Sequence, residues 1–290
     1  MLPPPLAGVN SKSARLATSR QLPYTAAMKC AILLVAFGAA GRQAQEALRG
    51  VDAQVRTAFP GLPVRWAYTS HLLRERLALA RQKSDSVLKA LRRLQFEGFR
   101  QVAVQPLQSI PGDEYGEVRA VLEEVAVSSA MRLELGTPLL NDEADVEAAA
   151  QAVLAHLPAE RRPDEDVVLM GHGARHPAMS RYEALARAVR ARDTHIHVGA
   201  MSGPLELEAL LPALVSRRVW LLPLLSVVGR HALEDMAGEA ESSWRSRLER
   251  AGHECCPILR GMAEYRGFAA IWLRHLAQAV ARLDGRTEGA

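Results

Sequence analysis

The chain has 290 residues, of which 49% are hydrophobic and 23% are charged, so it is long enough for one large domain or two ordinary ones with a substantial core. This composition excludes a disordered, collagen-like or coiled-coil protein. The sequence also excludes a membrane-spanning helix, because the longest apolar runs, at 31–37 and 219–228, are too short to cross a bilayer.

The formal net charge of +4 reflects 32 arginines against only 4 lysines. Arginine is suited to bidentate recognition of carboxylates, so we expect some of these side chains to face an acidic ligand; the alternative is that all are solvated on helix surfaces. The basic residues are spread through the predicted helices, and only 5% of the residues are aromatic. We therefore expect neither a nucleic-acid nor a membrane partner.

The first 27 residues are polar and contain prolines, without the continuous apolar segment of a secretory signal. We expect residues 1–27 to form a disordered tail and the folded part to begin at Met28. The three cysteines, of which Cys255 and Cys256 are adjacent, form neither a disulfide framework nor a C-x-x-C metal pattern. This indicates a reducing compartment, and we predict a cytoplasmic protein.

After the tail, short apolar runs alternate with longer amphipathic stretches, which predicts an α/β fold with mostly parallel sheets. A polar segment at 161–166 predicts a boundary near residue 160, dividing the chain into an N-terminal half at 28–160 and a C-terminal half at 161–290. The predicted strands span 30–36, 64–68, 101–105, 132–136, 167–171, 196–200, 218–223 and 255–259. The predicted helices span 41–58, 70–80, 84–97, 112–127, 142–156, 178–191, 204–216, 231–251 and 265–283.

The two halves repeat one pattern. Residues 106–114 align without a gap to 223–231 and share Pro, Leu, Ser and Gly at one spacing. We expect a duplicated α/β module whose halves face each other across a central cleft; the alternative is turn chemistry common to all α/β proteins. The residues that correspond in the two halves are Phe37 with His172 and Glu114 with His231, so imidazole groups gather in the second half.

Two histidines stand at predicted carboxyl ends of strands, where open α/β sheets bind their ligands. His172 lies between two glycines, which allow a sharp turn and expose the imidazole as a base or metal ligand, unless it is a turn residue bonded to a backbone carbonyl. His231 opens a helix, whose N-terminus favours a neutral ring able to bind a cation; the alternative is a simple capping residue. Nitrogen and oxygen ligands without a thiolate suit cobalt, nickel, iron or zinc. The histidines expected to be structural or solvated are His195, His197, His253 and His275.

A third metal ligand is expected on the strand between those that precede His172 and His231. This strand ends at Met201 and Ser202. Ser202 is suited to cap the helix that follows. Glu206 and Glu208 lie in the first turns of that helix, and Glu208 is expected to complement the helix dipole.

Four phrases occur in order along the chain: LVAFG at 34–38, GDEY at 112–115, MGHG at 170–173 and GRHALEDMA at 229–237. In these phrases the chain resembles the anaerobic-pathway sirohydrochlorin cobaltochelatases, from about residue 29 to about residue 280. The resemblance implies an ATP-independent class II chelatase with two similar α/β halves, which inserts Co(II) into sirohydrochlorin in cobalamin biosynthesis and needs no organic cofactor. It also implies that His172 is the proton acceptor and a metal ligand, and that His231 is another ligand.

The chain departs from this family at one position. The family's third ligand is a glutamate after a V-G-A-x phrase, whereas the phrase at 198–201 is followed here by Ser202. Glu206, one helical turn further on, then becomes a ligand, or Glu114 does so from across the cleft, or water completes the shell. The residues expected to contact the macrocycle are Phe37, Tyr68, Leu107, Glu114 and Ser202, with Arg42, Arg175 and Arg230 as candidates for its carboxylates.

Metal insertion needs a base for the pyrrole protons and a weak, open metal site, and neutral histidine with nitrogen and oxygen ligands provides both. The same ligands suit Fe(II), so a sirohydrochlorin ferrochelatase that forms sirohaem is an alternative function. A non-catalytic carrier of a tetrapyrrole or a metal is another. The oligomeric state is left open, with a homo-oligomer as one option.

Overall fold

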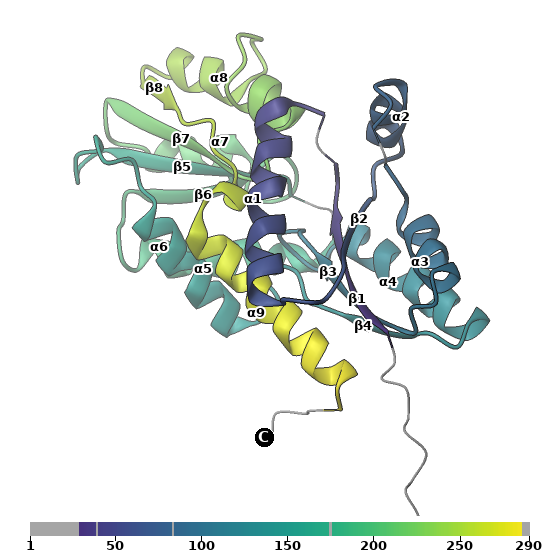
Figure 1. Ribbon diagram of the computed structural model, residues 1–290. Coiled ribbons are helices and arrows are strands. Elements are labelled where there is room, and N and C mark those ends of the chain that lie inside the picture. The colour runs from purple at the N-terminus through teal and green to yellow at the C-terminus, as the bar shows by residue number, and fades with distance from the viewer. Residues whose placement is uncertain (1–28, 39, 83, 174–175, 286–290) are drawn as a thin grey trace, which may run out of the picture.

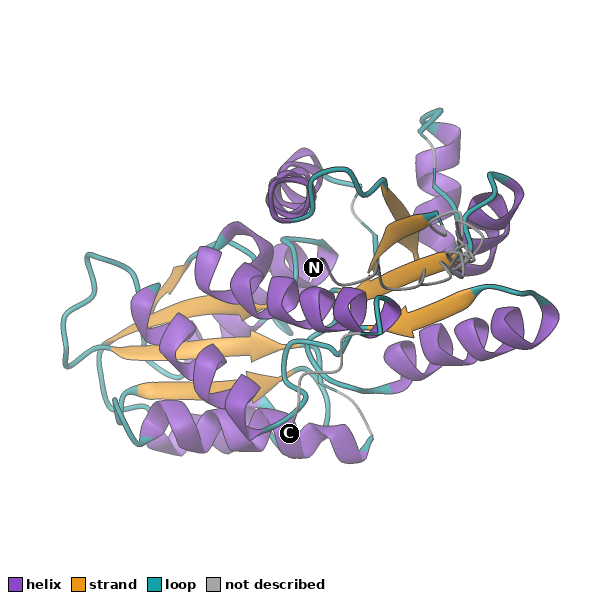
Figure 2. Ribbon diagram, turned by 60° about the horizontal axis from the view of Figure 1, so that its bottom comes forward, coloured by secondary structure: helices purple, strands orange, loops and turns teal. Residues whose placement is uncertain are grey.

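The computed structural model describes residues 29–38, 40–82, 84–173 and 176–285 (Figure 1). The tail expected at 1–27 and the side chain of Arg175 lie outside the described residues. Within them, the chain forms two four-stranded parallel sheets with helices packed against them (Figure 2). In the described part of the chain, each helix is too short or too polar to cross a membrane.

The two sheets have the same strand order. In each, the first strand is flanked by the second and the third, and the fourth strand lies at the edge beside the third. The first strand of each sheet is an almost continuous buried apolar run, as expected for a parallel strand covered on both faces. The first sheet contains β1 (Cys30–Ala36), β2 (Val64–Tyr68), β3 (Gln101–Pro106) and β4 (Arg132–Leu135). The second sheet contains β5 (Asp166–Gly171), β6 (Ile196–Ala200), β7 (Arg218–Leu224) and β8 (Glu254–Pro257).

The loops that follow the third strand of each sheet carry the same hydrogen bonds, which confirms the predicted repeat. In each half, two backbone N–H groups of the segment after the fourth strand donate to two carbonyls of this loop. The four bonds run from Leu139 to Gln108 at 3.0 Å, from Leu140 to Ser109 at 2.8 Å, from Met262 to Leu225 at 2.9 Å and from Ala263 to Ser226 at 2.9 Å. The acceptors are the positions that the gap-free sequence alignment pairs, so the two halves share a loop conformation as well as a strand order.

The helices are held to the sheets by apolar stripes at helical spacing. α1, for example, buries Ala44, Leu48, Val51 and Val55 in the main core. The helices of the first half are α1 (Arg42–Ala58), α2 (His71–Leu79), α3 (Val87–Phe96), α4 (Asp113–Ser128) and α5 (Glu143–Ala155). Those of the second half are α6 (Ser180–Arg190), α7 (Leu207–Leu210), α8 (Trp244–Arg250) and α9 (Arg266–Leu283).

Two predicted helices are wrong in extent. The helix expected at 204–216 is reduced to the single turn of α7 and a 3-10 turn at Leu211–Ala213, because Pro204 and Pro212 remove backbone donors there. The helix expected at 231–251 divides into a π-helical turn at His231–Met236 and the separate α8. Gly238 lies between them, where a Cβ atom would be 2.3 Å from the carbonyl oxygen of Glu234.

The last helix crosses the predicted boundary near residue 160. α9 packs against β3, β4 and α5, and its yellow ribbon lies along the first half in Figure 1. Arg282 donates to the Glu134 carboxylate at 2.8 Å, and Arg132 donates to the Leu283 carbonyl at 3.0 Å. Residue 160 therefore separates the two sheets, but α9 of the second half packs against the first half. As a boundary between domains it stays a prediction.

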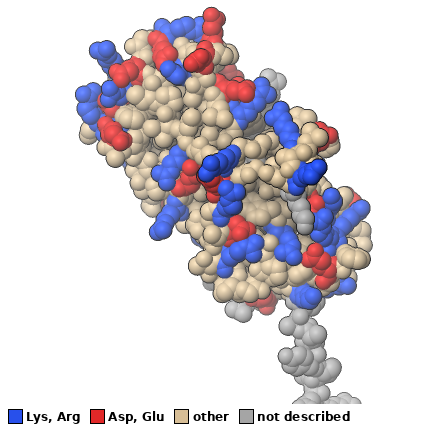
Figure 3. All heavy atoms as spheres, turned by 45° about the horizontal axis from the view of Figure 1, so that its top comes forward, with Lys and Arg blue, Asp and Glu red and all other residues tan. Residues whose placement is uncertain are grey.

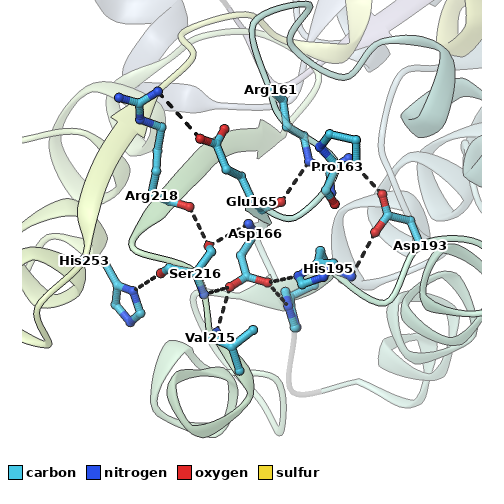
Figure 4. A network of polar contacts seen from close by, with 11 residues as sticks. Arg161, Pro163, Glu165, Asp166, Asp193, His195, Val215, Ser216, Arg218 and His253 are labelled. Atoms are coloured by element: carbon cyan, nitrogen blue, oxygen red, sulfur yellow. Dashed lines mark hydrogen bonds and ion pairs between the residues drawn. The ribbon is translucent and has the colours of Figure 1, made fainter.

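Asp166 connects the amino ends of three strands in the second sheet (Figure 4). Its buried carboxylate accepts hydrogen bonds from the backbone N–H groups of Val215 and Ser216, both at 2.8 Å. It also lies 3.0 Å from His195 Nδ1 and 3.2 Å from His197 Nε2. Burial alone would raise the pKa of Asp166, but hydrogen bonds from Ser216, His195 and Val215 outweigh it and lower the pKa to about 2. One carboxylate thus ties β5 to β6 and to the segment before β7.

The remaining histidines of the expected structural set are also bonded within the fold. His253 Nδ1 lies 2.9 Å from the Ser216 carbonyl. His275 is buried, with Nε2 at 2.8 Å from Asp145 and Nδ1 at 3.0 Å from the Thr137 carbonyl. The interpretation of these side chains as structural is therefore confirmed by their contacts.

Candidate functional site

The structure brings His172 and His231 together. His172 directly follows β5, and His231 begins the π-helical turn after β7. Their ring centroids are 5.0 Å apart, and the rings meet edge to face at 77°. His172 is exposed, and the side chain of His231 is 42% exposed. Two accessible imidazoles thus stand together at the carboxyl end of the second sheet.

Each of these rings has an oxygen acceptor beside Nδ1. His172 Nδ1 lies 3.2 Å from the Gly173 carbonyl, and His231 Nδ1 lies 2.6 Å from the carboxylate of Asp235, one helical turn further on. An acceptor at Nδ1 places the proton of a neutral imidazole there and leaves the lone pair on Nε2. The backbone bond expected of a turn histidine is therefore present in His172, and it is compatible with a base or ligand acting through Nε2.

The turn after β5 requires glycine at position 173. Gly173 has a φ of +79°, and a Cβ atom there would lie 2.3 Å from the carbonyl oxygen of Ser202 and 2.9 Å from its hydroxyl oxygen. Ser202, at the position where the resemblance expects a glutamate, therefore lies against the His172 turn.

Glu114 approaches the two imidazoles from the first half. It lies in the first turn of α4, after the loop that follows β3. Burial raises the pKa of its carboxyl group, and the nearby His172 and His231 act in the opposite direction. The carboxyl group is therefore within electrostatic reach of both rings, and the three side chains belong to the segments that follow β3, β5 and β7. Among the described residues, no three His, Cys, Asp or Glu side chains lie close enough together to hold a metal ion.

Glu206 is placed differently from Glu114. It is the exposed N-cap residue of α7, and its charge acts on the guanidinium of Arg247. Arg247 also forms an ion pair with Glu208, so this acidic pair faces α8. The charges of the two histidines act on Glu114, whereas Glu206 acts on Arg247.

The residues expected to contact the macrocycle have different surroundings. Phe37 is 49% exposed at the end of β1. Tyr68 lines a cavity of about 320 Å³ between α1, β2 and α2, together with Trp66. Leu107 lies in the main core, and its carbonyl accepts a hydrogen bond from the Ser226 hydroxyl. The leucine side chain therefore packs within the fold, and Phe37 remains the exposed apolar group of the three.

The two described arginines that are candidates for substrate carboxylates pair with acidic residues on their own helical turns. Arg42 lies 2.9 Å from Glu46, and Arg230 lies 2.7 Å from Glu234. On the face shown in Figure 3, basic side chains are interspersed with acidic ones. Much of the arginine content is thus solvated in surface pairs, which is the alternative weighed from the composition.

Sequence reasoning missed two residues that adjoin the histidines. Asp235 follows His231 by four residues, and this helical spacing was a usable signal. Tyr182 is buried beneath the end of β5, with its ring against Gly171. No local pattern in the sequence marks Tyr182, because its approach to Gly171 depends on how α6 packs against the second sheet.

Comparison with known proteins agrees with this geometry. Residues 30–281 match the family described as Cobalt chelatase (CbiK). The chain belongs to the CbiK cobalt chelatase family. It is 52% identical to the sirohydrochlorin cobaltochelatase CbiKC of Nitratidesulfovibrio vulgaris over 288 residues, which cover 98% of this chain and 100% of that protein. It is 34% identical to the sirohydrochlorin cobaltochelatase of Salmonella typhimurium, over 87% of this chain and 97% of that protein.

Solved structures of chelatases share the fold of this CbiK family member. SirB from Bacillus subtilis with Fe3+ aligns with a TM-score of 0.59 and 15% identity, over 89% of this chain and 98% of that one. CbiX, described as the terminal enzyme of sirohaem biosynthesis in denitrifying bacteria, aligns with a TM-score of 0.54 and 16% identity, over 86% of this chain and 99% of that one. The predicted family and the predicted two-half α/β fold are therefore confirmed.

Proposed function

We propose that this protein inserts Co(II) into sirohydrochlorin, with His172 as base and metal ligand, His231 as second ligand and Glu114 as the anionic third ligand. The observation that carries the proposal is the pair of accessible imidazoles, His172 and His231, at the carboxyl end of the second sheet, and the charges of these rings act on Glu114 of the first half. The family membership and the two sirohydrochlorin cobaltochelatase relatives support the choice of metal and macrocycle. Glu114 thus takes the role for which the sequence also offered Glu206.

The reaction exchanges two pyrrole N–H protons for one divalent cation. His172 Nε2 accepts a proton from the macrocycle as Co(II) moves onto the ring nitrogens, and solvent receives the second proton. Asp235 holds the Nδ1 proton of His231 and orients its Nε2 toward the cation. Because side chains remove the protons and deliver the metal, we infer that the reaction needs neither ATP nor an organic cofactor.

The proposed metal ligands suit an ion that must be released from the protein to the macrocycle. Two neutral imidazoles and one carboxylate bind Co(II) through nitrogen and oxygen, which is weaker than binding through thiolates. The cysteine thiols lie elsewhere, in β1 and β8, and all three are unpaired. Free thiols also support the proposal of a cytoplasmic location.

The test is an anaerobic absorbance assay with sirohydrochlorin and Co(II). We expect the spectral change of metallation to be faster with protein than without it, and to be lost in His172→Ala. Fe(II) replaces Co(II) in a parallel series, and a higher kcat/KM with Fe(II) would make the protein a ferrochelatase. Stoichiometric binding of either ligand without acceleration would make it a carrier and contradict the proposal.

A further inference from the structure

The turns after the first strand of each sheet have the same construction. In the first half, the backbone N–H of Thr69 donates to the carbonyl of Ala36, the last residue of β1, at 3.0 Å. In the second half, the backbone N–H of Met201 donates to the carbonyl of Gly171, the last residue of β5, at 3.1 Å. The residue that follows each of these two strands therefore has an equivalent place in its half.

The two residues in this place are Phe37 and His172. Each is followed by a glycine with a positive φ, +140° at Gly38 and +79° at Gly173. A Cβ atom on Gly38 would lie 2.9 Å from the Leu73 side chain after β2, just as one on Gly173 would meet the segment after β6. Phe37 thus holds in the first half the place that the proposed base holds in the second.

The two turns lie at facing ends of the sheets. In Figure 2 the strand arrows of the two sheets point toward each other, so their carboxyl ends meet. The backbone of Leu107 connects these ends: its N–H donates to the carbonyl of Val35 in β1 at 2.8 Å, and its carbonyl accepts from the Ser226 hydroxyl of the second half. The end of β1 is therefore connected through Leu107 to the loop after β7, which leads to His231.

The Phe37 ring departs from the burial of the strand that carries it. Residues Ala31–Ala36 of β1 are buried, whereas Phe37 is 49% exposed. A phenylalanine ring is stabilised when its apolar surface is removed from water, and a planar substrate bound at this end would cover it. Other exposed apolar side chains follow strands at the same ends, namely Leu72 after β2, Leu233 after β7 and Leu259 after β8.

We propose that Phe37 is a substrate-binding residue, whose ring stacks on the face of sirohydrochlorin turned toward the first half, while His172 and His231 reach the metal from the opposite face. This inference rests on the proposed function. Sirohydrochlorin is a conjugated macrocycle, and offset stacking on an aromatic ring stabilises it without adding a nitrogen or oxygen atom that would compete for Co(II). The repeat thus places an aromatic ring and an imidazole at matched positions on the two sides of the macrocycle.

The first test measures the dissociation constant of metal-free sirohydrochlorin by absorbance, without Co(II). We expect Phe37→Ala to raise this constant about tenfold, because the stacking contact is lost. Phe37→Tyr should bind as the wild type does, because it keeps the aromatic plane. Phe96→Ala is the matched control: Phe96 is 93% exposed at the last residue of α3, before the amino end of β3, and its removal should leave sirohydrochlorin binding unchanged.

The second test separates binding of the macrocycle from binding of the metal. Titration with Co(II) alone should give the same affinity in Phe37→Ala and wild type, because the ring does not contact the ion. In the metallation assay, Phe37→Ala should raise KM for sirohydrochlorin about tenfold and change kcat less than about twofold, because the lost contact is equal in the ground state and the transition state. The melting temperature should stay close to that of wild type, since the ring is exposed.

Unchanged sirohydrochlorin affinity in Phe37→Ala would overturn the inference. An equal loss of Co(II) affinity would also overturn it, because the variant would then disturb the site as a whole. Full sirohydrochlorin affinity in Phe37→Leu would mean that any apolar side chain suffices, which contradicts stacking. If the wild type bound sirohydrochlorin without inserting Co(II), the proposed function would fall, while the binding titrations would still decide the role of Phe37.

Discussion

The two ends of the second sheet carry the same residue types in opposite environments. At the amino end, His195 and His197 share the carboxylate of Asp166, which also accepts two backbone N–H groups (Figure 4). At the carboxyl end, His172 and His231 are accessible, and each has an oxygen acceptor at Nδ1. The partners of a histidine, and not its presence at a strand end, therefore indicate whether it stabilises the fold or carries chemistry.

The physical reason lies in what each end of a parallel sheet has to accommodate. The amino ends of β5, β6 and β7 are joined by buried polar contacts, and an ionised group there is stabilised only when several donors surround it. The carboxyl ends open toward the facing sheet, where ligands of α/β proteins bind. An imidazole ring with one nitrogen hydrogen-bonded and the other free is suited to the carboxyl end, because a ring at this end must exchange protons or a metal ion with a substrate.

The largest expected effect is on activity at the carboxyl end. His172→Ala should reduce the rate of Co(II) insertion by about a thousandfold or more, because it removes the general base and a metal ligand together. Its melting temperature should stay close to that of wild type, since the side chain is exposed. The anaerobic absorbance assay and thermal denaturation measure both quantities.

His197→Ala is the matched histidine variant from the amino end. His197 is buried beside Asp166, so this substitution should lower the melting temperature and leave kcat of the folded protein unchanged. If His197→Ala removed activity from fully folded protein, or His172→Ala unfolded the chain, the contrast between the two ends would be wrong.

Asp166→Asn should produce the largest loss of stability. The asparagine amide keeps one acceptor oxygen, but its NH₂ group faces backbone N–H groups that are themselves donors. These buried donors lose their acceptor, so the free energy of unfolding should fall by about 3 kcal/mol. Denaturant titration measures this change. An unchanged midpoint would show that the carboxylate contributes little to the fold.

Acid unfolding is expected to depend on the same carboxyl group. Because the folded pKa of Asp166 is about 2, below its ordinary value of 3.8, its contribution is complete above about pH 4 and is lost as the pH falls toward 2. This amounts to about 2 kcal/mol for a buried group. The wild type should therefore lose stability between pH 4 and pH 2 more steeply than Asp166→Asn, and parallel curves would contradict the assignment.

The sheet strands were predictable from sequence because parallel strands are short apolar runs between amphipathic helices. Strands such as β1 and β6 have the predicted bounds. The helix predictions failed where backbone chemistry overrode the apolar pattern, at Pro204 and Pro212 and near Gly238. The passage of α9 to the first sheet is a tertiary contact, which no local pattern encodes.

The candidate site was predictable only in part. His172 and His231 were marked by their glycines and by the repeat, and the structure places their rings 5.0 Å apart. The sequence left Glu114, Glu206 and water open as third ligand, because the distance between residues of different halves depends on how the halves pack. Tyr182 was missed because its approach to Gly171 depends on how α6 packs on the second sheet.

The partner of His231 gives a smaller effect. Asp235→Asn should lower kcat for Co(II) insertion about tenfold, because the neutral amide holds the Nδ1 proton less firmly and makes Nε2 a weaker ligand. The neighbouring Glu234→Gln removes only a surface pair with Arg230 and should leave kcat unchanged. Equal activities of the two variants would show that Asp235 has no role in the site.

The smallest expected effect is a gain of metal affinity at Ser202. Its hydroxyl oxygen would lie only 2.9 Å from a Cβ atom on Gly173, so Ser202→Glu should place a carboxylate beside the His172 turn. A second anionic ligand should tighten Co(II) binding about tenfold, without a matching gain in turnover, since a metal held more firmly in the ground state must still leave for the macrocycle. Glu206→Ala serves as the control: the Glu206 carboxylate acts on Arg247, so Co(II) affinity should stay at the wild-type value. Calorimetric titration of both variants separates the possibilities. Weaker binding in Glu206→Ala would make Glu206 the third ligand in place of Glu114, and unchanged affinity in Ser202→Glu would mean that position 202 does not face the ion.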